Sequence, residues 1–345
     1  MGFIDDVSAQ PAVLRELVSA YRGTLAADLD RAAGLVAAAQ DRPLVVTGMG
    51  SSLSAGRTLD RSTRQVILED AGELLHYGIG AAAAAGAVIA VSQSGRSYET
   101  VAVVERLRAL GTQAPVIAVC NDPASPLAGM ADVALPMLAG TEANVATKTY
   151  VAAIAVLLML QRGACDAALA SDLLAAAAEM ERLNASDAAG EVCRRMAGCR
   201  AVVFVGRGPG LGAAAYAALT SKESAAIPTE ALAGGAFRHG PMELAGPGAG
   251  IVVVAPDGPT SGLATSLAVE TAELGSPTWL IGGGVADAGV ALPDGLHHTP
   301  LAPLPEALAA LAAVVPLQHL AAGLARFVGR EPGRTLVASK VTDRE

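Results

Sequence analysis

The chain has 345 residues, a formal net charge of −9 at pH 7 and a hydrophobic fraction of 52%. That length favours two domains, and the composition excludes a disordered chain because it can supply a large apolar core. The acidic balance argues against a nucleic-acid-binding protein, which holds phosphates with basic side chains. The four cysteines form no CxxC pair and the first residues show no secretory signal, so we expect a cytoplasmic protein with free thiols.

Helical patterns and apolar strands alternate through the first half of the chain. Residues 1–34 predict N-terminal helices, and the stretch Pro11–Ala38 predicts one or two of them. The run Pro43–Gly50 is an apolar strand that ends in a Gly-x-Gly turn, and two further strands follow at Val88–Val91 and Val116–Val119. Each strand is a continuous apolar run, which is typical of a parallel sheet covered on both faces.

The three strands recur in the second half in the same order. The turn that ends at Gly50 is answered by one that ends at Gly208, 158 residues later, and the next two strands are answered by Ile251–Val254 and Thr278–Ile281. Strands that alternate with helical patterns predict a doubly wound α/β sheet in each half. We therefore expect N-terminal helices over 1–34, a first α/β domain over 35–170, a linking helix over 171–185, and a second α/β domain with a C-terminal tail over 186–345.

Serine-rich turns follow two strands of the first half. Gly50-Ser51-Ser52 comes after the first strand, and Ser92-Gln93-Ser94-Gly95-Arg96-Ser97 comes after the second. Ligands of doubly wound sheets bind beyond the carboxyl ends of the strands, where backbone N–H groups and hydroxyls at helix starts bind anions. The alternative is that these serines only cap the helices that follow. Two such turns in one half favour a phosphate site.

A dinucleotide site is the main rival for the second Gly-rich turn, Gly206–Gly212. One register replaces the third glycine by Leu211, and the other ends in Ala213, which is permitted. The acidic residue at the required distance, Glu230, follows no clear apolar strand, so we expect no cofactor. The sequence contains no GxxxxGK[ST] phosphate loop and no metal-binding motif. The apolar stretch Ala307–Val328 contains interrupting polar residues and predicts a buried or dimer-facing helix, so no membrane partner is expected.

With these motifs the chain resembles the sugar isomerase (SIS) family, in the form that has two SIS domains in tandem. It is similar to the isomerase half of glutamine–fructose-6-phosphate aminotransferase and to SIS-type glucosamine-6-phosphate deaminases, over nearly the whole chain from Pro11. The segments that carry the resemblance are Gly48–Ser52, Ser92–Ser97, Gly140–Lys148, Glu230–Leu244 and Val341–Thr342.

The resemblance implies a phosphorylated amino sugar as ligand and a homodimer with a shared active site. It implies that Glu223 moves a proton between C1 and C2 of the sugar, that His239 opens the sugar ring from across the dimer interface, and that Lys340 closes over the open-chain form. It also implies that the sugar and its phosphate are held or lined by Ser51, Ser52, Ser92, Gln93, Ser94, Ser97, Val145 and Ala146.

The residue types fit this chemistry. Aldose–ketose isomerisation needs a ring-opening group and a carboxylate beside C1 and C2. Glu223 lies next to Lys222 in an alanine-rich helix, where packing alone does not require a charged pair, although a solvated helix face also explains it. His239 lies in a Gly-rich loop, and histidines in loops are often functional. Glu142 and Lys148 are either a structural pair or ligand contacts.

Several positions differ from the aminotransferase pattern. Arg96 stands where that pattern has glutamate, Thr220 and Pro228 replace a lysine and a histidine, and Lys340 comes one place after the expected lysine. The Gln-Ser-Gly-Arg-Ser form and a lysine directly before Val-Thr are shared with deaminase-like members. We therefore predict an isomerase or deaminase of a glucosamine-6-phosphate-like sugar, without a glutaminase domain. The alternatives are a phosphosugar sensor without activity and the sugar-isomerase subunit of a split aminotransferase.

Overall fold

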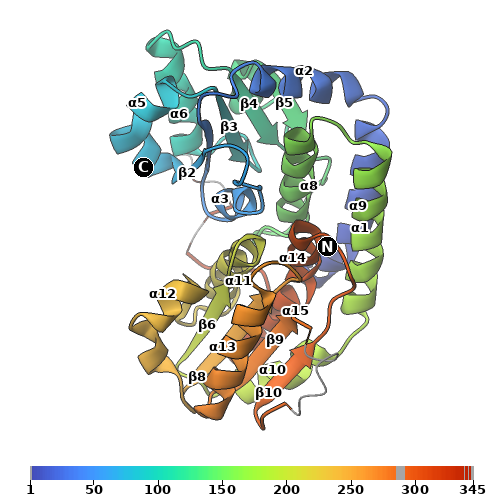
Figure 1. Ribbon diagram of the computed structural model, residues 1–345, viewed down its shortest axis with the longest axis vertical. Helices are drawn as coiled ribbons and strands as arrows, with labels where there is room; N and C mark the ends of the chain where they lie inside the picture. Colours follow the sequence, from blue (N-terminus) through green and yellow to red (C-terminus); the bar gives the residue numbers. More distant parts are fainter. Residues whose placement is uncertain (1, 285–291, 338, 341, 343–345) are drawn as a thin grey trace. The chain divides into compact units, whose positions relative to one another are not determined.

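The computed structural model describes residues 2–284, 292–337, 339, 340 and 342, and the chain divides into two compact units. Unit 1 consists of Met1–Pro11, Ala143–Ala146 and Ala175–Val337. Unit 2 consists of Ala12–Glu142, Thr147–Leu174 and Ala338–Glu345. Each unit contains one parallel five-stranded sheet, and Figure 1 shows helices beside each sheet. The units thus interleave along the chain, whereas the expected domains are consecutive ranges.

The sheet of unit 2 has the strand order β2-β1-β3-β4-β5, and all neighbouring strands are parallel. Val45, Val88 and Ala118 lie in one buried cluster with Val103 and Leu107 of α6, so α6 covers one face of the sheet. The strands are β1 (Leu44–Gly48), β2 (Val66–Asp70), β3 (Ala87–Ser92), β4 (Val116–Cys120) and β5 (Val133–Pro136). The helices are α2 (Ala26–Ala37), α3 (Ser51–Gly56), α4 (Ala71–Glu73), the π-helix η1 (Leu74–Gly78), α5 (Ile79–Ala83), α6 (Tyr98–Ala109), α7 (Pro126–Met130) and α8 (Lys148–Arg162).

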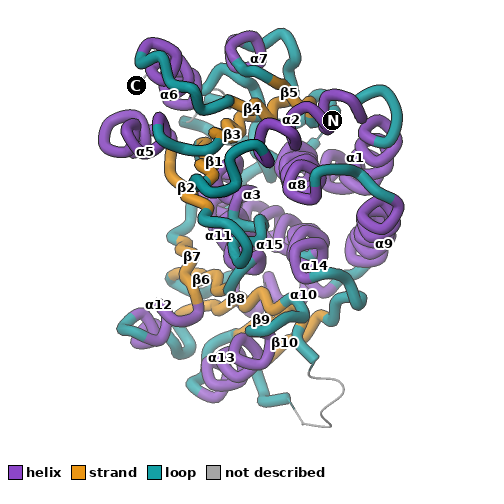
Figure 2. The backbone as a smooth tube through the Cα atoms, turned by 45° about the horizontal axis from the view of Figure 1, so that its top comes forward, coloured by secondary structure: helices purple, strands orange, loops and turns teal. Residues whose placement is uncertain are grey.

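The sheet of unit 1 repeats this topology with the order β7-β6-β8-β9-β10, again entirely parallel. Val203, Ile251 and Leu280 lie in one buried cluster with Leu267 and Ala268 of α13, and Figure 2 shows the strands lying between layers of helices. The strands are β6 (Ala201–Gly206), β7 (Thr229–Ala233), β8 (Ala249–Ala255), β9 (Thr278–Gly282) and β10 (Leu296–Thr299). The helices are α10 (Ala188–Met196), α11 (Pro209–Ala225), α12 (Gly234–Arg238), the 3₁₀-helix η2 (Pro241–Leu244), α13 (Ser261–Glu273), α14 (Glu306–Ala312) and α15 (Val314–Phe327).

Two helices cross the boundary between the units, α1 (Phe3–Tyr21) and α9 (Ala167–Asn184). Helix α1 begins eight residues before the expected start at Pro11, and the proline lies inside it. Proline has no N–H, so it cannot donate to the carbonyl four residues earlier. The side-chain amide of Gln10 donates to that carbonyl, on Val7, at 3.0 Å. The helix therefore continues through a residue that usually starts or breaks one.

The apolar stretch near the C-terminus is a core feature of unit 1. Residues Glu306–Phe327 are long and apolar enough to cross a membrane, but 83% of their most apolar window is buried inside the protein. They form α14 and α15, and α15 packs against α11 and α10. This agrees with the expectation of a buried helix and is the pattern of a helix in the protein core.

Candidate functional site

The two serine-rich turns lie at the same edge of the unit 2 sheet. Strands β1 and β3 are parallel neighbours with Gly48 opposite Val91, so the turns that follow them leave the sheet side by side. The chain passes from β1 outward to β2 and from β3 outward to β4, which makes this the point where the strand order reverses. Such switch points are where doubly wound sheets bind ligands. The structure therefore brings together Ser51, Ser52, Ser92, Gln93, Ser94 and Ser97.

Hydroxyl groups converge within the second of these turns. The hydroxyls of Ser92 and Ser97 lie 3.1 Å apart, and the Gly95 N–H donates to the Ser92 Oγ at 3.1 Å. Ser97 is the N-cap residue of α6, yet its side chain makes no capping hydrogen bond. The N-cap of α3 is Gly50, so Ser51 and Ser52 lie inside that helix. Helix capping therefore does not explain these serines.

Glycine is required at position 95. Its φ is +61°, and a Cβ at this position would lie 2.1 Å from the Ser125 Oγ. The neighbouring Arg96 turns outward and forms an ion pair with Asp122 at 2.9 Å. A backbone hydrogen bond from Ala124 and then the Arg96 guanidinium lower the pKa of the Asp122 carboxyl. The Arg96–Asp122 ion pair thus links the turn after β3 to the turn after β4.

The tail residues 339, 340 and 342, which the structure describes, belong to unit 2, and one of them contacts the start of α6, directly after the second serine turn. The Thr342 carbonyl accepts a hydrogen bond from the Tyr98 N–H at 3.0 Å, at the first residue of α6. The Lys340 Nζ donates to the Glu142 carbonyl at 2.7 Å and lies 3.8 Å from the Glu142 Oε1. Lys340 is thereby placed in the unit that carries the serine turns. The other tail residue of the expected motif, Val341, lies outside the described residues.

Glu142 forms hydrogen bonds with both the start of α8 and the tail residue Lys340. Its side chain is 1% exposed, and its Oε2 accepts hydrogen bonds from the N–H groups of Thr147 and Thr149 at 3.1 Å each. The Thr149 hydroxyl donates to the Oε1. The Lys148 ammonium donates to the Thr141 carbonyl. The sequence left open whether Glu142 has a structural role or contacts a ligand. In the structure it has a structural role, because it hydrogen-bonds both to the start of α8 and to Lys340 of the tail.

Glu223 lies near the end of α11 in unit 1. The Glu223 Oε2 is buried and has no hydrogen-bond partner among the described residues. Burial raises the pKa of this carboxyl from the ordinary 4.5 to about 7, since removal from water disfavours the charged form. A carboxyl with these properties can take up and release a proton near neutral pH. A fully solvated helix face, the alternative for Glu223, is not observed.

Two further polar groups lie close to Glu223 in the sequence of α11. The hydroxyls of Thr220 and Ser221 are buried and accept or donate no hydrogen bond among the described residues. Thr220 and Glu223 are three residues apart, which places them on one face of α11 one turn apart. Buried polar groups are nearly always satisfied in folded proteins. The last turns of α11 therefore offer hydrogen-bonding groups that no other described residue uses.

The remaining site residues of unit 1 are His239, Val145 and Ala146. His239 follows the short helix α12 and is exposed to solvent, and its ring makes no hydrogen bond within the described part of the chain. The structure of one chain therefore does not join His239 to Glu223. Val145 is buried, and the Ala146 carbonyl accepts a hydrogen bond from Tyr216 of α11 at 2.7 Å. Sequence reasoning missed Tyr216, which has no distinctive motif.

The dinucleotide hypothesis is not supported by the position of Glu230. Gly208 is the N-cap of α11, so the Gly-rich turn does open a helix. Glu230, however, is the second residue of β7 and pairs with Val203 in the interior of β6. The acidic residue of a dinucleotide site lies at the carboxyl end of its strand.

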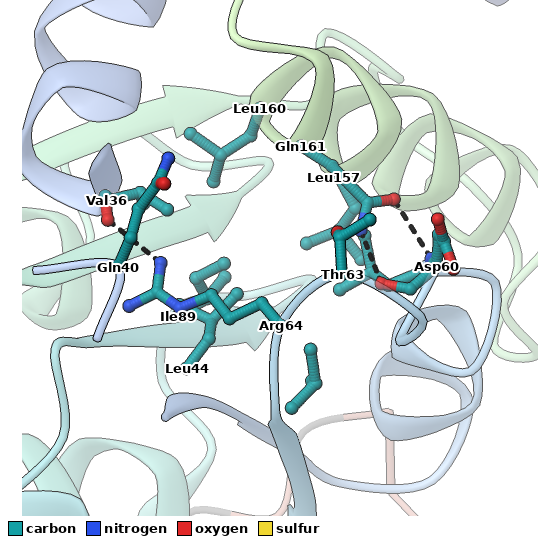
Figure 3. A pocket seen from close by; sticks show the side chains of 12 residues that line it. Val36, Gln40, Leu44, Asp60, Thr63, Arg64, Ile89, Leu157, Leu160 and Gln161 are labelled. Carbon is teal, nitrogen blue, oxygen red and sulfur yellow. Dashed lines mark hydrogen bonds between the residues drawn. The ribbon is translucent and has the colours of Figure 1, made fainter. Parts of the chain in front are cut away.

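A separate cavity of about 340 Å³ lies in unit 2, lined by residues at the start of β1 and β2 and the end of α8 (Figure 3). The Arg64 guanidinium beside it donates to the carbonyls of Val36, Ala39 and Arg42. Asp60 and Gln161 exchange two hydrogen bonds across another wall. None of the expected site residues lines this cavity, and its polar groups serve to join structural elements.

Comparisons with known proteins identify the family. Residues 38–161, which include the whole unit 2 sheet, match the SIS domain. The chain is 30% identical over 309 residues to a glutamine–fructose-6-phosphate aminotransferase of Pyrococcus horikoshii, covering 84% of this chain and 50% of that protein. It is 31% identical over 255 residues to the Escherichia coli protein of the same name, covering 71% of this chain and 41% of that protein. The chain thus spans about half the length, or less, of these curated relatives.

Solved structures share the fold over nearly the whole chain. The C-terminal domain of glucosamine–fructose-6-phosphate aminotransferase from Francisella tularensis superposes with a TM-score of 0.81 at 22% identity, covering 96% of this chain and 97% of that one. A glucosamine-6-phosphate deaminase from Thermotoga maritima gives 0.74 at 18%, with 98% of both chains covered. At these identities the likeness shows a common fold. Residues 38–161 therefore belong to the SIS domain family, and the chain is homologous to part of the glutamine–fructose-6-phosphate aminotransferases.

Proposed function

We propose that the chain is an enzyme that converts an amino-aldose phosphate of the glucosamine-6-phosphate type to a ketose phosphate of the fructose-6-phosphate type. The observation that carries the proposal is Glu223, a buried carboxyl with an unused oxygen and a pKa of about 7. Proton transfer between neighbouring carbons needs such a group, because it must be a base in one step and an acid in the next. The names of the structural and sequence relatives support the same substrate class.

The residues have distinct roles in this reaction. The hydroxyls and helix N-terminus of the 92–97 turn bind the phosphate, since both present donors to an anion. His239, supplied by a second copy of the chain, opens the ring, which fits its exposure in one chain. Lys340, held by Glu142, lies beside the open-chain sugar as a fixed positive charge.

The bond changes centre on C1 and C2 of the open-chain sugar. Glu223 removes the proton from C2, the electrons of that C–H bond form a C1–C2 double bond, and the aldehyde oxygen takes up a proton from water, which gives an enol with the amine on C2. Glu223 then returns its proton to C1 while the C2 amine loses a proton to water, which leaves an alcohol at C1 and an imine at C2. Water adds to the imine and ammonia leaves, which yields the ketose phosphate. A substrate with a hydroxyl at C2 follows the same proton transfers to a ketone without loss of ammonia.

The test is to incubate the purified protein with glucosamine-6-phosphate and to assay ammonia and fructose-6-phosphate separately. Equal amounts of both products support deamination, and interconversion of 2-hydroxy aldose and ketose phosphates without ammonia supports isomerisation alone. Tight binding of phosphosugars with no turnover across a panel contradicts the proposal and supports a sensor. Activity that requires glutamine and a separate glutaminase would assign the chain to a split aminotransferase.

A further inference from the structure

A short segment of the chain, Ala143–Ala146, is fixed to unit 1 at both of its ends by hydrogen bonds. The Ala143 N–H donates to the Asp6 Oδ2 at 2.7 Å. At the other end, the Ala146 carbonyl accepts from the Tyr216 hydroxyl at 2.7 Å. Between them, the Asn144 amide donates to the Thr335 hydroxyl at 3.1 Å. This segment contains both residues that the SIS resemblance assigns to the lining of the sugar site, Val145 and Ala146.

Tyr216 is itself held in a buried polar network. Its hydroxyl accepts a hydrogen bond from the Gln318 amide of α15 at 2.7 Å. The Gln318 side chain exchanges two further hydrogen bonds with Gln10 of α1, at 2.8 and 2.9 Å. All three side chains are fully buried. Hydrogen bonds in such an environment are strong and leave little freedom of orientation, so the Tyr216 hydroxyl is set in one position.

The same tyrosine lies on the face of α11 that carries the proposed base. Tyr216, Thr220 and Glu223 are spaced at i, i+4 and i+7, which brings them onto one side of a helix. Seven residues correspond to about 10 Å along the axis. A single rigid helix therefore carries both the Glu223 carboxyl and the group that binds the Ala146 carbonyl.

We infer that Tyr216 is a positioning residue that fixes the Val145–Ala146 segment relative to Glu223 and thereby sets the affinity for the sugar. Its effect reaches the substrate through the Ala146 carbonyl and not through direct contact. This inference rests on the proposed function, and it takes Val145 and Ala146 as part of the sugar site, as the SIS resemblance implies. It adds residues from three helices, Gln10, Tyr216 and Gln318, that no sequence motif marks.

The test compares Tyr216→Phe with Tyr21→Phe. Tyr21 is a matched control, since it is also fully buried and donates from its hydroxyl to a backbone carbonyl, that of Pro136, at 2.9 Å. Tyr21→Phe loses one buried hydrogen bond, and Tyr216→Phe loses two, to the Ala146 carbonyl and from the Gln318 amide. Both variants should therefore melt a few degrees below the wild type, and Tyr216→Phe should melt at the lower temperature. Only Tyr216→Phe should raise KM and the Kd for the sugar phosphate, by about tenfold, the equivalent of one such bond.

Further readouts separate positioning from catalysis and from general loosening. The Tyr216→Phe variant should keep kcat within about twofold and keep the pH midpoint of kcat, because Glu223 is unchanged. Hydrogen exchange of the 143–149 amides should accelerate in Tyr216→Phe and not in Tyr21→Phe. Equal KM values in wild type and Tyr216→Phe, with an active wild type, would overturn the inference alone. A wild-type protein that neither binds nor converts any phosphosugar would overturn the proposed function, and this inference with it.

Discussion

Replacing Glu223 by glutamine should stabilise unit 1 at alkaline pH, although it removes the proposed catalytic base. Burial raises the pKa of this carboxyl from 4.5 to about 7, so the native state binds the proton more tightly than the unfolded state does. The free energy of unfolding of the wild-type protein must then fall as the pH rises through this interval. The carboxyl is protonated in both states below about pH 4.5 and ionised in both above about pH 7, so its contribution changes only between them.

The size of the effect follows from the two pKa values. One pKa unit corresponds to about 1.4 kcal/mol, so a pKa of about 7 means that ionised Glu223 destabilises the native state by roughly 3 kcal/mol at pH 8. Glutamine has nearly the same size and does not ionise, and its amide contributes a difference that does not depend on pH. The quantity to measure is therefore the free energy of unfolding of Glu223→Gln minus that of the wild type. The prediction is that this difference increases from acid to alkaline pH.

The assay is urea unfolding of the wild type and Glu223→Gln at a series of pH values between about 4 and 8, followed by tryptophan fluorescence. The single tryptophan, Trp279, is fully buried in β9 of unit 1, so its emission reports the unfolding of the unit that contains Glu223. The control is Glu273→Gln, which removes an exposed carboxylate from α13 of the same unit. The stability difference between Glu273→Gln and the wild type should not change over this pH range. If the difference between Glu223→Gln and the wild type also stays constant with pH, the account of a buried, protonated carboxyl is refuted.

Three other substitutions test separate parts of the structure. Gly95→Ala forces a Cβ against Ser125 in the serine turn, so calorimetry should show phosphosugar binding weakened by at least about tenfold; an unchanged Kd would contradict the assigned phosphate site. Lys340→Met keeps the stem and removes the charge, and kinetic assays should show kcat lowered by about tenfold or more with the melting temperature unchanged; full activity would exclude a role for the lysine. Thr299→Val removes the hydroxyl that accepts a hydrogen bond from the Trp279 indole at 2.9 Å. Its free energy of unfolding should be about 1–3 kcal/mol lower than that of the wild type, and its Trp279 emission should shift. A variant as stable as the wild type would contradict this.

The central strands of both sheets were predictable, and the edge strands were not. Strands β1, β3, β4, β6, β8 and β9 appear as continuous apolar runs because helices cover both of their faces. Strands β2, β5, β7 and β10 are the edge strands of the two sheets, and each contains half-exposed positions. Their apolar pattern is too weak to distinguish them from loops. In β7, for example, the charged residue Glu230 interrupts the apolar pattern.

The candidate site was predictable where it depends on local motifs and not where it depends on long-range contacts. The serine turns follow apolar strands and contain glycines with positive φ, Gly50 and Gly95, which sequence patterns identify. The grouping of the C-terminal tail with unit 2 and of Ala143–Ala146 with unit 1 depends on contacts between residues far apart in the chain. The Tyr216–Ala146 hydrogen bond joins residues 70 positions apart, and no local pattern encodes it.

The most direct test of the central claim measures turnover and binding of glucosamine-6-phosphate for Glu223→Gln beside Glu273→Gln at pH 8. The account predicts that Glu223→Gln lowers kcat by about 10²–10⁴-fold, as expected for loss of a general base, while its Kd stays close to that of the wild type. Glu273→Gln should retain both values. A Glu223→Gln protein that converts the sugar at the wild-type rate would contradict the assignment of Glu223 as the proton-transferring group.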